Sequence, residues 1–167
     1  MANNSARTLL ITFSTVAILL AAQVSALASA GPSVNGGGVV GGPLGVTSQL
    51  GMHATRSGGS FLCIMAGRSG GFPFGGMTIL QMQVEGSVTA GTLTITGSSS
   101  SFSGTATVRV VGRTASGIHT ETHSNVPYIS SQGSGGAGRA WHQLQIPAFG
   151  IDTGMSALTA GHISITQ

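Results

Sequence analysis

The chain contains no lysine, one cysteine, one tryptophan, one tyrosine and three acidic residues among its 167 positions. A single cysteine excludes an intrachain disulfide. The acids, Glu85, Glu121 and Asp152, are far apart in the sequence, which disfavours paired-carboxylate glycosidase chemistry and an Asp-rich calcium loop. The arginines are scattered and the aromatic residues form no cluster with them, so the basic patch that nucleic acid needs is missing. We therefore expect no enzyme, no cofactor and no nucleic-acid partner.

The first thirty residues predict a signal peptide. Arg7 precedes an apolar run over residues 9–22, and Ala28-Ser29-Ala30 provides a small-residue cleavage site. The run is shorter than the roughly twenty residues that a membrane-spanning helix needs, although an uncleaved membrane anchor is the alternative. We expect a secreted protein, extracellular or periplasmic, that begins at Gly31 and has no membrane contact after the signal is cleaved.

The remainder, residues 31–167, predicts a single all-β domain. It holds all 28 glycines, which separate short runs rich in Thr, Val, Ile and Ser. Such runs with hairpin-length connections favour an antiparallel β-sandwich or a small β-barrel of about eight or nine strands. One run, residues 77–88, has an irregular pattern, because Ile79 lies outside the alternation of Met82 and Val84.

Two of the expected strands have informative patterns. Val46, Leu50 and Met52 alternate with polar residues, which predicts a strand with one buried face. The following run "SFLCIMA", residues 60–66, is apolar on both faces and predicts a central strand covered on both sides. Cys63 in this run is expected to be a buried, unreactive thiol. A reactive thiol or an interchain disulfide is the alternative.

Several glycine-rich motifs resemble the post-COAP family of small secreted bacterial domains. The motifs are "NGGG", "LGMHATRSGGSF", "SFSGTATV", "GRAWHQLQI" and "GHISI". The resemblance covers most of residues 36–165. It implies a secreted all-β module, found alone or attached to other extracellular modules, and it implies no particular activity. The acidic residues that the family has around its glycine-rich turn are missing from "QGSGGAGRAW", residues 132–141, which argues against ion binding there.

The closest spacing of ionisable residues is in "GIHTETHSN", where His119, Glu121 and His123 alternate and so share one strand face. Positions four apart on a straight strand are separated by roughly 13 Å, so one metal ion can bind at most two of the three side chains. A third ligand would have to come from another strand, and His142 is the first candidate, followed by His53 or His162. We expect instead that the three face solvent without a metal, and that Ile118, Thr120 and Thr122 face the core.

One further motif points to hydrolase chemistry. "GRSGG", residues 67–71, matches the G-x-S-x-G pattern of a serine nucleophile elbow. The elbow requires a helix directly after the serine, and the sequence "GGFPFGG" that follows is incompatible with a helix. Asp152 is also the only aspartate available to orient a catalytic histidine. The match is expected to be accidental in a chain so rich in glycine and serine.

The remaining functional classes are structural and binding roles. The first hypothesis is a non-catalytic extracellular structural or adhesion-type module with an unknown extracellular or cell-surface partner, which includes self-association. Its edge strands would lack the lysines that usually prevent edge-to-edge pairing. The second is a small β-barrel that binds an apolar ligand among Phe61, Phe102 and Trp141. A metal-binding or hydrolytic protein is a distant third.

Overall fold

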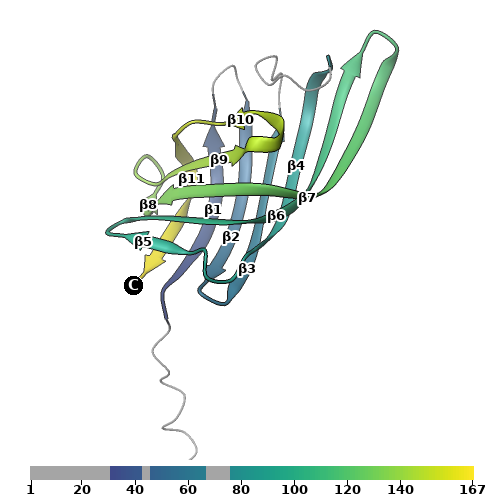
Figure 1. The fold of residues 1–167 in the computed structure, drawn as a ribbon. Coiled ribbons are helices and arrows are strands. Elements are labelled where there is room, and N and C mark those ends of the chain that lie inside the picture. The colour runs from purple at the N-terminus through teal and green to yellow at the C-terminus, as the bar shows by residue number, and fades with distance from the viewer. Residues whose placement is uncertain (1–30, 43–45, 67–75) are drawn as a thin grey trace, which may run out of the picture. The chain divides into compact units, whose positions relative to one another are not determined.

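The computed structural model describes residues 31–42, 46–66 and 76–167, and within them the fold is an antiparallel β structure (Figure 1). Residues Gly31–Gln167 form one compact unit. The predicted signal peptide lies outside the described residues. The strands are β1 (Ser33–Gly41), β2 (Thr47–Thr55), β3 (Gly58–Ala66), β4 (Thr78–Val88), β5 (Thr94–Thr96), β6 (Ser99–Thr114), β7 (Gly117–Gly133), β8 (Gly135–Gly136), β9 (Trp141–Ile146), β10 (Ile151–Asp152) and β11 (Ser156–Thr166), and the 3-10 helix η3 spans Pro147–Phe149.

The strands belong to one sheet whose pairings close into a ring. The order is β10-β9-β7-β6-β4-β3-β2-β1-β11-β8, and β5 pairs with β6 outside this path. Because β9 also pairs with β11, the eight strands β1, β2, β3, β4, β6, β7, β9 and β11 form the ring. The closing contact is short, with Ser156 opposite His142 and Ala157 opposite Trp141. The predicted all-β, antiparallel fold is confirmed.

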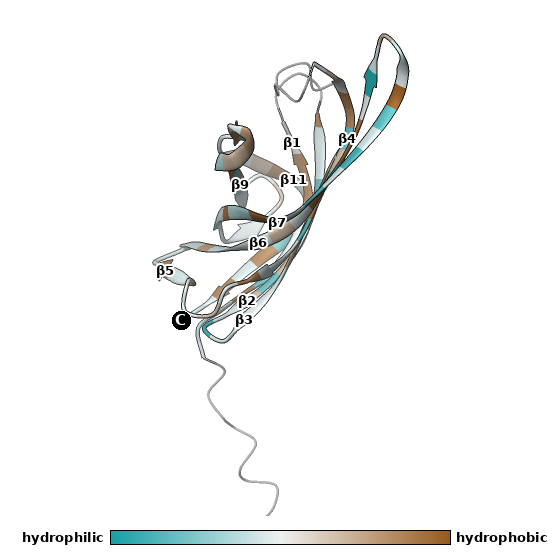
Figure 2. Ribbon diagram, turned by 45° about the vertical axis from the view of Figure 1, so that its right-hand side comes forward, coloured by the Kyte–Doolittle hydropathy of each residue, from teal (hydrophilic) through white to brown (hydrophobic). Residues whose placement is uncertain are grey.

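The core lies inside the ring and contains every second residue of the strands. In β2, Leu50 and Met52 are buried and their neighbours are not, as the sequence predicted. In β3 the prediction was wrong, because only one face is covered. Cys63 is 1% exposed, but Leu62 is 37% exposed on the outer face. A ring of strands has only one interior, so even a uniformly apolar strand leaves half of its side chains outside. Figure 2 shows apolar and polar residues along the strands.

A β-bulge explains the irregular pattern in β4. The pairing with β6 shifts between Ile79 and Gln81, which places one extra residue in β4. As a result, Ile79 and Met82 both face the core although they are three positions apart, whereas in a regular strand residues three apart point to opposite faces. The sequence therefore predicted the irregularity, and the bulge is its structural cause.

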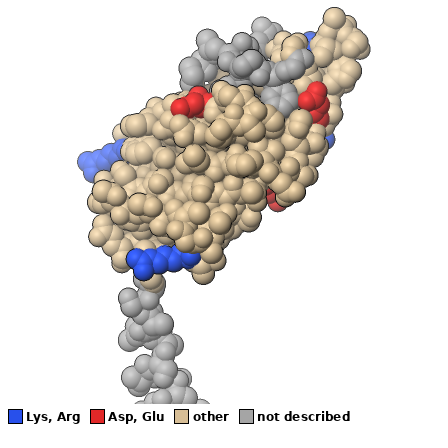
Figure 3. Space-filling view, in the orientation of Figure 1, with Lys and Arg blue, Asp and Glu red and all other residues tan. Residues whose placement is uncertain are grey.

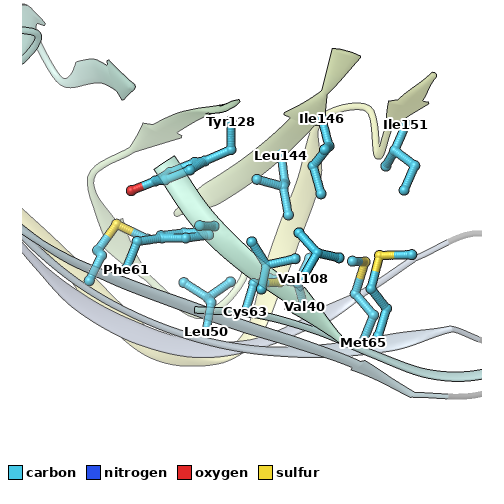
Figure 4. Close-up of a cluster of buried hydrophobic side chains, with 14 of the residues drawn as sticks. Val40, Leu50, Phe61, Cys63, Met65, Val108, Tyr128, Leu144, Ile146 and Ile151 are labelled. Atoms are coloured by element: carbon cyan, nitrogen blue, oxygen red, sulfur yellow. The ribbon is translucent and has the colours of Figure 1, made fainter. Parts of the chain in front are cut away.

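Aromatic rings fill the middle of the core. Phe61 on β3 stacks on Tyr128 of β7, with ring centroids 4.9 Å apart, and meets Phe102 of β6 edge-on at 6.0 Å. Figure 4 shows Phe61 and Tyr128 facing each other from opposite parts of the sheet. The Tyr128 ring packs against the backbone of Gly86 and Gly104. A Cβ atom on either glycine would lie about 3 Å from the Cε1 atom of Tyr128, so a larger residue would crowd the ring. These aromatic contacts connect strands β3, β6 and β7 across the interior of the ring of strands.

Strand β7 consists of two different halves. Its C-terminal half pairs with β6 on one side and with β9 on the other, from Ile129 to Gly133. Its N-terminal half pairs only with β6 among the described strands, and Gly117–Thr122 is exposed at every position. Between the halves the register shifts, and Asn125 has a φ of 58°. We call Gly117–Thr122 the arm of β7. Figure 1 shows it extending beyond the body of the sheet together with β6.

Candidate functional site

Two of the alternating residues, His119 and Glu121, are in the arm, and His123 directly follows it. The Nε2 atom of His123 lies 3.4 Å from Oε2 of Glu121, and Nε2 of His119 lies 3.0 Å from the Ser116 hydroxyl. The His123 ring also meets the Phe149 ring of η3, with centroids 5.1 Å apart. His119 and Glu121 are exposed and His123 is half-buried.

The predicted orientation of this strand was wrong. Residues directly opposite in an antiparallel pair project to the same face. His119, Glu121 and His123 stand opposite three β6 residues that face the core, Gly112, Val110 and Val108. Ile118, Thr120 and Thr122 are therefore on the outer face, and Ile118 is 63% exposed. His119 and Glu121 are solvent-accessible because the arm extends beyond the pairings that close the ring, and no described strand lies opposite its inner face.

His142, the proposed third ligand, lies in a different place. It is on β9, opposite Gln132 of β7 and Ser156 of β11, whereas the arm pairs only with β6. It is 3% exposed and faces the core. Across the described ranges, there is no group of three or more His, Cys, Asp or Glu side chains placed to hold a metal ion. The structure therefore does not bring His142 to the arm.

His142 is instead part of a buried chain of hydrogen bonds. The Gln132 amide donates to the Ser100 hydroxyl at 2.7 Å, and the Ser130 hydroxyl donates to Gln132 Oε1 at 3.0 Å. Because the Ser130 proton is used in that bond, His142 Nε2 must carry the proton that it shares with Ser130 Oγ at 3.1 Å. The imidazole also stacks on Phe61 at 5.8 Å. Burial lowers the pKa of His142 from 6.5 to about 4, so the ring is neutral near pH 7.

Sequence reasoning missed this buried chain, although its signal was present. Ser130 and Gln132 have the same alternation as the buried Val126 and Tyr128, and His142 has the same alternation as Leu144 and Ile146. The alternation of side chains between the two faces of a strand would by itself have placed these three polar side chains inside. We had considered His142 only as a possible metal ligand. Buried polar groups are uncommon, but here each of the three has a hydrogen-bond partner.

A small cavity adjoins His142 and Cys63. Its volume is about 30 Å³, and Ser48, Met65, Leu144 and Ser156 are among the side chains that line it. Burial raises the pKa of Cys63 to about 12, and a hydrogen bond with Ser48 opposes this in part. The predicted buried thiol is confirmed, since Cys63 is a free, buried cysteine. The cavity is a small fraction of the 300–1,000 Å³ typical of sites for drug-sized ligands.

The three aromatic residues assigned to an interior ligand site do not share one space. Phe61 and Phe102 are buried in the core. Trp141 is on the outer face of β9, next to the half-buried Gln143 and Gln145. A Cβ atom on Gly133 would lie 2.1 Å from Trp141 Nε1, so the indole ring lies directly over the backbone of β7. The prediction that Trp141 contributes to the interior was wrong. His142, Leu144 and Ile146 point to the inner face of β9, and Trp141, which alternates with them, points to the outer face.

Charged side chains are separated on the described surface. Figure 3 shows isolated blue and red residues on a predominantly uncharged face. The one ion pair among the described residues is the contact between His123 and Glu121. The Asp152 carboxylate accepts hydrogen bonds from three N–H donors, and these bonds lower its pKa; the donors are the side-chain amides of Gln143 and Gln145 and the backbone of Gly154. The "GRSGG" motif lies outside the described residues.

Among the residues that the structure describes, no helix has the length and apolar character to cross a membrane. No protein-family model, curated protein or solved structure matches the chain. The resemblance to the post-COAP family therefore stays a prediction based on the glycine-rich motifs.

Proposed function

We propose that the chain is a secreted, non-catalytic structural or adhesion-type β module that acts through its outer surface. The proposal is carried by the arm of β7. Gly117–Thr122 contributes no buried side chain, so the stability of the core does not account for it. One edge of this segment is not paired with another described strand. An unpaired edge presents backbone N–H and C=O groups that can pair with a strand of another molecule.

The composition of the arm supports this proposal. Exposed edges are commonly blunted by lysine, proline or inward-pointing charges. The arm has no lysine and no proline, and Ile118 adds an exposed apolar side chain on its outer face. Glu121, on the face that continues the core, is the only acid there and the only charge of the inward-pointing kind. We propose that a further copy of the chain or another extracellular strand pairs with this edge.

The alternative, an apolar-ligand-binding β-barrel, has less support. The described interior is occupied by side chains such as Phe61, Tyr128 and Leu144, and the cavity beside His142 has room for little more than water. A ligand of ordinary size would require these side chains to move. The metal-binding alternative loses its third ligand, because His142 is bonded to Ser130 in the core.

The test is sedimentation of the secreted chain over a wide range of concentrations. We expect reversible association, and we expect Thr120→Lys to weaken it by about tenfold or more because a lysine is placed on the unpaired edge. Thr105→Lys is the matched control. It adds the same charge to an exposed position on β6, where β4 and β7 already pair with both edges.

Two results would contradict the proposal. One is association that Thr120→Lys and Thr105→Lys weaken equally, since the effect would then come from net charge alone. The other is stoichiometric binding of an apolar fluorescent probe that extracted lipid displaces, which would favour the ligand-binding alternative.

A further inference from the structure

A shallow hollow lies on the outer face of the sheet where β5, β6, β7 and β9 are neighbours. Its volume is about 220 Å³. The residues that line it are Thr94, Thr96, Ser99, Ser100, Ser101, Ser131 and Trp141. The Ser100 hydroxyl belongs to the buried chain of hydrogen bonds, and the other polar residues of the lining carry hydroxyls on the outer face. None of them is ionisable near neutral pH. The hollow is thus an uncharged, hydroxyl-rich surface with a single aromatic residue.

Trp141 provides a flat ring at one end of this hollow. The five-membered part of its indole lies over Gly133, where a Cβ atom would be 2.1 Å from Nε1 and 2.5 Å from Cδ1. One face of the ring therefore covers the backbone of β7, and Trp141 is half-buried with its other side on the surface. The indole N–H makes no hydrogen bond to any residue that the structure describes, so it remains a donor for a ligand.

Two amides on the same strand face are held in a fixed orientation. Gln143 and Gln145 donate through Nε2 to the two carboxylate oxygens of Asp152, at 2.7 Å and 2.9 Å. Because the carboxylate can only accept, the Oε1 atoms of both amides are directed elsewhere. They form no hydrogen bond within the described part of the chain. Each is therefore a preoriented acceptor on the face of Trp141, Gln143 two positions along β9 from it and Gln145 four positions.

The strand register arranges these groups in rows across the sheet. One row contains Thr96, Ser99, Gly133 and Trp141, and the next contains Thr94, Ser101, Ser131 and Gln143. Neighbouring groups are about 4.8 Å apart across the strands, and the rows are roughly 7 Å apart along them. Hydrogen-bonding groups of several strands thus lie beside the Trp141 ring over an extended area of the outer face.

We propose that this face binds a neutral polysaccharide. The inference rests on the proposed function only for its extracellular setting. A pyranose ring has apolar C–H faces that stack on an indole and hydroxyls at its edge that both donate and accept. The Trp141 ring fits the first feature, and the Ser131 hydroxyl and Gln143 Oε1 fit the second. The face has no cation among its lining residues, and Asp152 at its border disfavours an anionic chain.

A protein partner fits this surface less well. Protein interfaces commonly have a buried apolar or aromatic centre surrounded by polar groups. Among the described residues, two exposed large apolar side chains lie near this face: Ile129, opposite Gln145 and 39% exposed, and Met155, which directly precedes β11 and is 68% exposed. Neither lines the hollow. The rest of the contact area consists of hydroxyls and amides, which suit a hydroxyl-rich ligand.

The experiment uses the intrinsic fluorescence of Trp141, which is the only tryptophan in the chain. The secreted protein is titrated with hydroxyethyl cellulose, dextran and galactomannan, and with alginate as an anionic comparison. Affinity electrophoresis in gels that contain the same polymers gives an independent measure of binding. We expect at least one neutral polymer to change Trp141 emission saturably, to protect it from iodide quenching and to retard the protein.

Three variants test the assignment. Trp141→Ala should weaken binding by about tenfold or more, and Trp141→Phe should weaken it less because a ring for stacking remains. Ser131→Asp places a charge in the hollow and should weaken binding at least as much as Trp141→Ala does. Ser60→Asp, on the exposed outer face of β3, is the matched control and should bind normally. Circular dichroism shows whether each variant is folded.

The proposal is overturned if no neutral polymer of the panel is bound, if only alginate is bound, or if Trp141→Ala and Ser131→Asp bind as the unmodified chain does. Its failure is distinguishable from that of the proposed function. Thr120→Lys should weaken association and leave polysaccharide binding unchanged, whereas Trp141→Ala should do the reverse.

Discussion

The two halves of β7 show how one strand takes part in two environments. From Val126 to Gln132, every second side chain is buried, and the strand has a partner on each side from Ile129 onward. From Gly117 to Thr122, no side chain is buried, and the strand has one described partner. Both halves alternate in sequence, and both pair with β6. The difference is that, among the described residues, core side chains such as Phe61 pack against the inner face of the C-terminal half, whereas no side chain of the arm is buried.

This comparison separates pairing from packing. Hydrogen bonds to β6 are present along most of β7, so pairing alone does not determine burial. Burial needs a second layer, which the ring supplies through Phe61 on β3 and His142 on β9. Because apolar burial supplies most of the folding free energy, the closed half should dominate stability and the arm should be nearly neutral. Four predictions test this contrast, from the largest expected effect to the smallest.

The first prediction concerns thiol reactivity. Cys63 is 1% exposed and burial raises its pKa to about 12, so a thiol reagent should label it at least about a thousandfold more slowly in the native protein than in denaturant. Ellman's reagent measures both rates. In a Cys63→Ser background, Ile118→Cys on the arm should react as fast as a small peptide. Rapid labelling of native Cys63, or a reducible dimer on a gel, would show that this part of the ring opens readily.

The second prediction compares apolar truncations in the two regions. Phe61→Ala removes a ring that stacks on Tyr128 and His142, and should lower the free energy of unfolding by about 3–5 kcal/mol. Ile118→Ala removes an exposed side chain from the arm and should change it by less than about 0.5 kcal/mol. Urea unfolding followed by circular dichroism measures both. Comparable losses in the two variants would mean that the arm is packed in solution.

The third prediction concerns pH. Burial lowers the pKa of His142 from 6.5 to about 4, so between these values the unfolded chain binds a proton that the folded chain does not. Stability should therefore be complete above pH 6.5, decline as the pH falls from 6.5 to about 4, and lose about 3 kcal/mol in total from this residue. Urea unfolding at a series of pH values measures the slope.

A matched pair of variants assigns that slope to one histidine. His142→Gln should be less stable at neutral pH but should have a flatter profile between pH 6.5 and 4. His119→Gln on the arm should keep the original profile. A profile that stays steep in His142→Gln would mean that another group is responsible.

The fourth prediction compares two glycines. Gly133→Ala places a Cβ atom 2.1 Å from Trp141 Nε1 and should cost about 1–3 kcal/mol as the indole is displaced. Gly51→Ala in β2 meets nothing within 4 Å and should be neutral or slightly stabilising. Thermal unfolding with Trp141 fluorescence as the signal measures both. If Gly133→Ala were as stable as Gly51→Ala, the indole would not lie over Gly133 in solution.

Several features of the fold were predictable from particular residues. The alternation of Val46, Leu50 and Met52 predicted the buried face of β2, and the broken alternation at Ile79 predicted an irregularity in β4. Turn glycines with positive φ, such as Gly91, mark strand ends as the sequence indicated. These signals are local, because alternation and turn geometry depend on neighbours in the chain.

The candidate sites were less predictable. His142 was predicted only as a possible metal ligand, but it lies in the core with its hydrogen bond to Ser130. The ligand-binding hypothesis placed Trp141 inside, but Gly133 provides room for its ring on the outer face. In both cases the deciding partner belongs to another strand, which a single strand's pattern does not reveal.

By itself, the sequence determined an antiparallel β domain with little charge and many turns, because strand alternation and glycine positions are local properties. Only the tertiary structure decided which strands meet, since β9 reaches β11 across a long separation in the chain. That closure sets one inner face for all eight ring strands and so fixes the burial of Cys63 and His142. It also ends before the arm of β7, and this is why His119 and Glu121 lie in solvent on the face that elsewhere forms the core.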